Sequence, residues 1–124
     1  MKHIILSSIH ENFHNLNLVI LYAKNRNIIS GFVLGDLINP GIMHQLGKSG
    51  LNLHLVFGNN DGDVFNLTKA ASKYENIDLL GEYGAVKVGE KNIFLIHDNV
   101  LGRLIVKSET YDLVLCGHNH IFSI

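Results

Sequence analysis

Residues 111–120 read Tyr-Asp-Leu-Val-Leu-Cys-Gly-His-Asn-His, a mainly apolar run that passes directly into a glycine and two histidines. Residues 28–36 and 51–59 have the same form, because each is a mainly apolar run that stops at a glycine followed by a polar side chain. Such a run is typical of a buried strand that leads into a loop. The repetition predicts a largely parallel inner sheet whose ligand site lies beyond the carboxyl ends of its strands.

Helical and strand patterns alternate along the chain. Apolar residues recur at helical spacing in residues 13–26, directly after Asn12, a suitable N-cap. Further helices are predicted for residues 40–48, 64–74 and 101–107, and strands for residues 4–6, 28–34, 51–57, 77–80, 85–88, 92–96 and 111–116. This order predicts an α/β fold with helices covering the sheet and an antiparallel hairpin among the short strands.

Composition limits the class of protein. The 124 residues, 47% of them hydrophobic, fit one domain spanning residues 1–124. A formal net charge of −1 provides no basic field for nucleic acid, so we expect no nucleic-acid partner. The longest apolar stretch, residues 18–23, is too short for a membrane span. The single cysteine, Cys116, excludes an intrachain disulfide and is expected to be a small core residue of a cytoplasmic protein.

Several predicted strands end in side chains that can bind metal ions. These side chains are His10, Asp36, Asn59, His97, His118 and His120. The carboxyl ends of parallel strands converge on one edge of a sheet, so these groups can meet although they are far apart in sequence. Imidazole, carboxylate and amide ligands suit divalent Mn, Fe, Ni or Zn better than calcium. Two such ions about 4 Å apart support phosphoester hydrolysis.

The order of these motifs resembles the calcineurin-like metallophosphoesterase superfamily, whose pattern is Asp-x-His, Gly-Asp, Gly-Asn-x-Asp/Glu, His, Gly-His-x-His. The resemblance covers residues 3–121 and is greatest to the small single-domain phosphodiesterases of bacteria and archaea. It implies a sandwich of two β-sheets flanked by helices, here truncated at the C-terminus. It also implies a first metal held by His10, Asp36 and His120, and a second held by Asp36, Asn59, His97 and His118.

The sequence departs from the family pattern at several positions. Ser8 stands where the family has its first aspartate, and a hydroxyl lacks the charge and basicity of a carboxylate. Glu11 replaces the glycine that usually follows His10, and Asn60 occupies the place of a histidine that assists the leaving group in many relatives. The resemblance gives Asp61 the role of orienting a neighbouring histidine. His118, Asn60 and Asp61 are therefore the residues expected to act in catalysis.

The resulting hypothesis is a metal-dependent phosphodiesterase that acts on a small phosphoester. It would use metal-bound hydroxide at a dinuclear site weakened by Ser8, with one or two divalent ions per chain, Mn foremost. The alternative is an impaired or inactive member that serves as a metal-binding or protein-interaction scaffold, as in the retromer sorting complex. We also expect a homo-oligomer, because the family usually continues past Gly-His-x-His with further strands.

The remaining histidines are expected to have structural roles only. They are His3, His14, His44 and His54, and none of them follows the end of a predicted strand. For the candidate ligands the competing interpretation is a hydrogen-bonded loop residue, and for Asp36 and Asn59 a turn residue. The clustering at strand ends favours the ligand interpretation.

Overall fold

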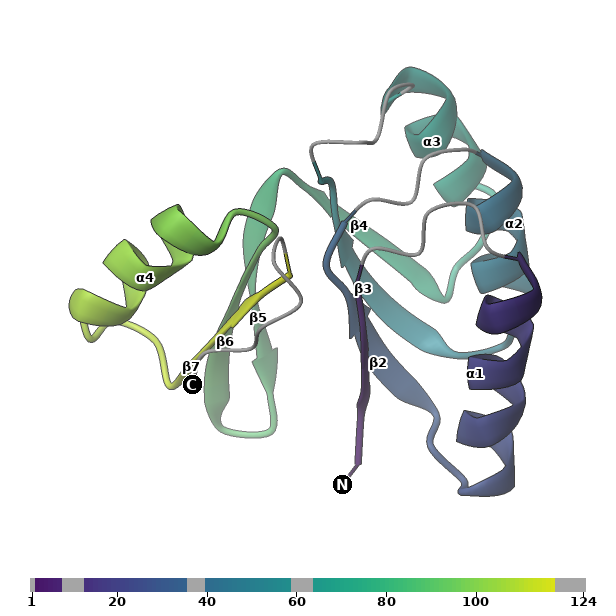
Figure 1. Cartoon of the computed structure of the whole chain (residues 1–124), viewed down its shortest axis with the longest axis horizontal. Helices are drawn as coiled ribbons and strands as arrows, with labels where there is room; N and C mark the ends of the chain where they lie inside the picture. The colour runs from purple at the N-terminus through teal and green to yellow at the C-terminus, as the bar shows by residue number, and fades with distance from the viewer. Residues whose placement is uncertain (1, 8–12, 36–39, 59–63, 118–124) are drawn as a thin grey trace.

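The computed structural model describes residues 2–7, 13–35, 40–58 and 64–117 (Figure 1). Within these ranges the helices are α1 (Phe13–Asn25), α2 (Pro40–Lys48), α3 (Val64–Ala71) and α4 (Asn99–Lys107). The strands are β1 (Ile4–Leu6), β2 (Ser30–Val33), β3 (Asn52–Val56), β4 (Ile77–Gly81), β5 (Tyr83–Val88), β6 (Lys91–Ile96) and β7 (Leu113–Cys116). None of the described helices is long and apolar enough to cross a membrane.

The strands form two sheets. The first has the order β1-β2-β3-β4 with every pair parallel. The second has the order β5-β6-β7, in which β5 and β6 are antiparallel and β6 and β7 are parallel. Figure 1 shows α1, α2 and α3 beside the first sheet and α4 beside the second. The predicted α/β class, with two sheets flanked by helices, is confirmed.

Apolar side chains fill the spaces between these layers. Side chains along β2 alternate between two clusters, with Val33 packed toward the helices of the first sheet and Phe32 and Leu34 packed between the two sheets. A sheet that is covered on both faces needs apolar residues at nearly every position of its strands. This requirement explains the apolar segments that end in Leu34 and Phe57.

Two helix boundaries differ from the sequence-based prediction by more than one residue. α3 ends at Ala71, because the next residues form a tight turn in which Tyr74 N donates to the Ala71 carbonyl at 3.1 Å. α4 begins earlier than predicted, at Asn99, because the Asp98 carboxylate accepts a hydrogen bond from Val100 N at 2.8 Å. An aspartate in this position satisfies an amide that would otherwise lack a partner at the helix N-terminus.

α4 contacts the second sheet through a glycine. A Cβ atom at Gly102 would overlap the Sγ atom of Cys116, which is buried in β7. Burial raises the pKa of the Cys116 thiol above its ordinary value, which keeps it neutral. The expectation that Cys116 is a small core residue is therefore confirmed.

Replacing Gly102 with alanine is expected to destabilise the protein by about 1 kcal/mol. Alanine gains about 1 kcal/mol in helix propensity, but overpacking a filled contact costs about 1–3 kcal/mol. In a Cys116→Ala background the sulfur is gone, so Gly102→Ala should then be stabilising. Urea unfolding of the four proteins in this double-mutant cycle measures the difference. A stabilising Gly102→Ala change in the parent protein would contradict this packing.

Candidate functional site

Strand ends from both sheets lie together at one edge of the sandwich. Leu34 N donates to the Leu6 carbonyl at 2.8 Å, which joins the end of β2 to the end of β1. Ser7 Oγ donates to the Gly117 carbonyl at 2.6 Å, which joins the end of β1 to the end of β7 in the other sheet. Gly117 N donates in turn to the His97 carbonyl at 3.3 Å. The edge is thus held by hydrogen bonds within each sheet and by the Ser7–Gly117 hydrogen bond, which crosses between them.

Gly35 lies where the ends of β2, β3 and β6 meet. Its φ of 100° is in the left-handed region that favours glycine. A Cβ atom at this position would lie 2.7 Å from the backbone N and Cα of Gly58 and 2.8 Å from His97 Nδ1. These distances are shorter than van der Waals contact, so the three strand ends approach this closely only because residue 35 is glycine.

His97 follows directly after β6 and is buried at this edge, with 5% of its surface exposed. Its Nδ1 atom lies 2.6 Å from the Leu34 carbonyl oxygen. A carbonyl only accepts hydrogen bonds, so Nδ1 must carry a proton, and Nε2 is the ring nitrogen that would bind a metal ion through its lone pair. Metal-ligating histidines make this same bond to a backbone carbonyl, which fixes the ring and its tautomer. The surroundings of His97 therefore fit a metal ligand.

All of the other residues predicted for the site lie outside the described ranges. They are Ser8, His10, Glu11, Asp36, Asn59, Asn60, Asp61, His118 and His120. Four of these residues are directly preceded in sequence by a described residue, namely Ser7, Gly35, Gly58 or Gly117. These four described residues contact one another or His97 at the strand-end edge. Among the described residues, no group of three or more His, Cys, Asp or Glu could hold a metal ion. The full ligand set stays a prediction.

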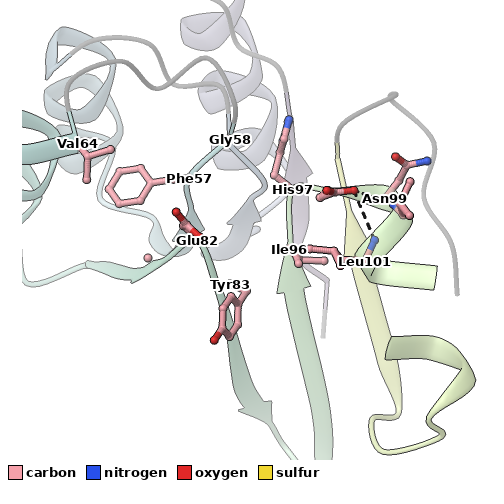
Figure 2. Close-up of a pocket in the computed structure, with 12 residues that line it drawn as sticks. Phe57, Gly58, Val64, Glu82, Tyr83, Ile96, His97, Asn99 and Leu101 are labelled. Carbon is pink, nitrogen blue, oxygen red and sulfur yellow. Dashed lines mark hydrogen bonds between the residues drawn. The ribbon is translucent and has the colours of Figure 1, made fainter. Parts of the chain in front are cut away.

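A pocket of about 850 Å³ borders His97. Its walls come from the end of β3, the start of α3, the connection between β4 and β5, and the segment from the end of β6 into α4. Figure 2 shows Phe57, Glu82 and Tyr83 on one side, with His97 and Leu101 on the other. Sequence reasoning missed this pocket, because apolar residues near a helix start or a turn do not by themselves indicate a ligand site.

The histidines expected to have structural roles are accounted for by local contacts or exposure. His3 Nδ1 lies 2.6 Å from Ser30 Oγ, and burial lowers the pKa of His3 below its ordinary value. His44 Nδ1 lies 2.8 Å from the Tyr74 hydroxyl, and His54 pairs with an aspartate across β3 and β4. His14 is exposed on α1.

This architecture is an α/β sandwich in which strand ends from two sheets meet at a buried histidine. A model of the calcineurin-like phosphoesterase superfamily domain matches residues 1–124. The chain therefore belongs to the calcineurin-like phosphoesterase superfamily, as the resemblance of its motifs predicted.

Individual relatives agree with this assignment. The chain is 24% identical to phosphodiesterase MJ0936 of Methanocaldococcus jannaschii over 123 residues, which cover 97% of this chain and 74% of that protein. It also superposes on the structure of an archaeal phosphodiesterase with a TM-score of 0.86 and 21% identity, covering 96% of this chain and 74% of the other. Vacuolar protein sorting 29 from Cryptosporidium parvum gives a TM-score of 0.67 at 19% identity, covering 96% and 65%. These structural similarities show the shared fold.

Proposed function

We propose that this protein is a metal-dependent phosphodiesterase. The observation that carries the proposal is buried His97, whose Nδ1–H donates to the Leu34 carbonyl at the point where the strand ends meet. This hydrogen bond fixes the orientation of the ring and therefore of Nε2, the proposed ligand atom. The name of the archaeal relative, a phosphodiesterase, favours the same activity.

The proposed ligand set extends beyond His97. The family motifs assign His10, Asp36 and His120 to a first ion, and Asp36, Asn59, His97 and His118 to a second. When bound, divalent ions polarise the phosphoryl oxygen and lower the pKa of water. Mn is our foremost candidate, because the carboxylate and amide oxygens of this mixed donor set suit Mn. The protein's own part is to hold these donors at the carboxyl ends of its strands.

Asp61 and Asn60 are proposed to act beside the ions. A carboxylate at position 61 would accept a hydrogen bond from the N–H of a ligating imidazole and so increase the basicity of that ring. Asn60 has no group that transfers a proton near neutral pH, so it would act as a hydrogen-bond donor to the substrate. We further propose that the protein works in the cytoplasm, where its one cysteine stays reduced.

Ser8→Asp is expected to restore the weakened first metal site. The added carboxylate supplies the charged oxygen that the family has at this position, so metal content should increase toward two ions per chain. Hydrolysis of bis-p-nitrophenyl phosphate should increase at least about tenfold, since loss of supporting groups at metal sites typically costs 10–100-fold. Ser8→Asn is the matched control, because the asparagine side chain is similar in size to that of aspartate and carries no charge. Unchanged metal content and rate in Ser8→Asp would overturn our account of Ser8.

The proposed function itself is tested by metal content and turnover in one sample. The protein is purified without chelator and dialysed against manganese, and metal per chain is then determined by elemental analysis. Hydrolysis of bis-p-nitrophenyl phosphate that is lost with EDTA and regained with Mn²⁺ would support the phosphodiesterase. An absence of bound metal together with an absence of turnover would overturn it.

A protein-interaction scaffold is a second candidate function. α4 exposes apolar side chains, with Val100 at 62% and Leu104 at 57%, and this is the surface expected of a docking module. Structural similarity to vacuolar protein sorting 29 is consistent with such a role. If the folded protein binds no metal and hydrolyses no phosphodiester, the scaffold function is favoured. The expected homo-oligomer stays a prediction.

A further inference from the structure

We propose that the pocket beside His97 binds an aromatic ester group of the phosphodiester substrate. This inference rests on the proposed function and adds to it a substrate class. The pocket directly adjoins the strand-end edge, because His97 belongs to both. A substrate whose phosphate lies at that edge can therefore extend one of its ester groups into the pocket. A volume of about 850 Å³ is within the range of small-molecule sites.

The charge of the pocket shows which part of the substrate it takes. Its lining includes two carboxylates, Glu82 and Asp98, and no lysine or arginine among the described residues. Asp98 is already engaged as the N-cap of α4, where its Oδ1 accepts from Val100 N. Carboxylates disfavour a bound phosphate, so the anionic part of the substrate should stay at the strand-end edge. The group inside the pocket should be uncharged.

The apolar walls of the pocket suit a flat ring. Phe57, Tyr83 and Leu101 line it together with other apolar groups. The Tyr83 ring stacks on Phe94, with 5.9 Å between ring centroids and an angle of 27° between the planes. This contact orients the ring, although 60% of Tyr83 is exposed. An exposed aromatic side chain held in place by a buried one is a surface on which a second ring can pack.

Glu82 adds a polar contact to this apolar surface. It is exposed at the connection between β4 and β5, and Figure 2 shows it between Phe57 and Tyr83. A carboxylate accepts hydrogen bonds, so it would favour a ring that carries an N–H or O–H donor. Phenolic, aryl and nucleoside esters share a flat ring, and a phosphate bearing only short alkyl esters lacks one. The inferred class is therefore a phosphodiester with at least one aromatic or heteroaromatic ester group.

The test compares direct binding of phenyl phosphate and methyl phosphate to the manganese-loaded protein by calorimetry. The two ligands carry the same anion and differ only in the ester group, so their affinity ratio isolates the pocket. We expect phenyl phosphate to bind about tenfold more tightly, the result of covering one ring. Tyr83→Ala should reduce this ratio to about one while leaving the affinity for methyl phosphate unchanged. Leu101→Gln, on the opposite wall, should do the same.

Phe65→Ala is the matched control, because Phe65 is a 75% exposed ring on α3 that does not line the pocket. It should leave both affinities unchanged. Equal affinities in the parent protein, or no measurable binding of either ligand, overturns the inference. Equal affinities with hydrolysis of bis-p-nitrophenyl phosphate retained would leave the proposed function standing. If phenyl phosphate bound more tightly but no phosphodiester were hydrolysed, the proposed hydrolase function would be overturned. The inference that the pocket binds aromatic phosphoesters would stand.

Discussion

Replacing His97 with asparagine is expected to reduce Mn²⁺-dependent hydrolysis of bis-p-nitrophenyl phosphate by at least about 100-fold, because the proposed metal ligand Nε2 is removed. The asparagine amide can still donate to the Leu34 carbonyl, so the hydrogen bond that Nδ1 makes at 2.6 Å has a replacement. Metal content should fall by one ion per chain. The readouts are kcat/KM, elemental analysis and the urea midpoint, since a preserved fold must accompany the loss.

His44→Asn is the control for this change. His44 also contacts another residue through Nδ1, at 2.8 Å from the Tyr74 hydroxyl, and it lies on α2 rather than at a strand end. It should keep full activity and full metal content. If His97→Asn also kept full activity and full metal content, His97 would be a buried structural histidine. The proposed function would then lose the observation that carries it.

Gly35→Ala is expected to destabilise the fold by about 3 kcal/mol or more. A left-handed φ costs an alanine about 1–2 kcal/mol, and the new methyl group would overlap the Gly58 backbone and the His97 ring, which adds about 1–3 kcal/mol. The displaced imidazole should also lower activity in the fraction that stays folded. Urea unfolding and assays below the midpoint measure the two effects separately.

Gly50→Ala is the control that separates the two costs of Gly35→Ala, the strained backbone conformation and the overlap with neighbouring atoms. Gly50 has a φ of 79°, but a Cβ atom there would meet no other atom within 4 Å. It should therefore cost about 1–2 kcal/mol from conformation alone and leave activity unchanged. If Gly35→Ala were no more destabilising than Gly50→Ala, the tight approach of β2, β3 and β6 would be wrong.

The sequence was sufficient to predict the fold class and the place of His97. The fold class follows from one pattern, an apolar run that ends in a glycine or a polar group, because buried parallel strands need that composition. The same pattern placed His97 after a strand end, but β6 and β7 lie in the second sheet, so the expectation that these strands share one parallel sheet with β2 and β3 is wrong. The family motifs sharpened the prediction of the fold class, and the family assignment confirmed that part of it. The other proposed ligands, including Asp36 and His118, lie outside the described ranges, so their roles stay predictions.

The pocket could not be predicted from sequence, for a physical reason. Tyr83 is brought beside the site by the direct connection of β4 to β5, and the sequence around it reads as a glycine-rich turn. The role of Asp98 cannot be read from the sequence either, because an aspartate after a strand can be a metal ligand or a helix N-cap. Only the three-dimensional contact with Val100 N identifies it as the cap.

The hydrogen bond between Ser7 and Gly117 has a consequence for how the protein is made. It joins residues 110 positions apart, so the first strand stays without this partner until almost all of the described chain has left the ribosome. At about 5–20 residues per second, this wait lasts roughly 5–20 seconds. Contacts that span such long loops also form slowly in the free chain. Nascent chains should therefore depend on chaperones to keep the apolar β2 and β3 from associating with other chains before the edge closes.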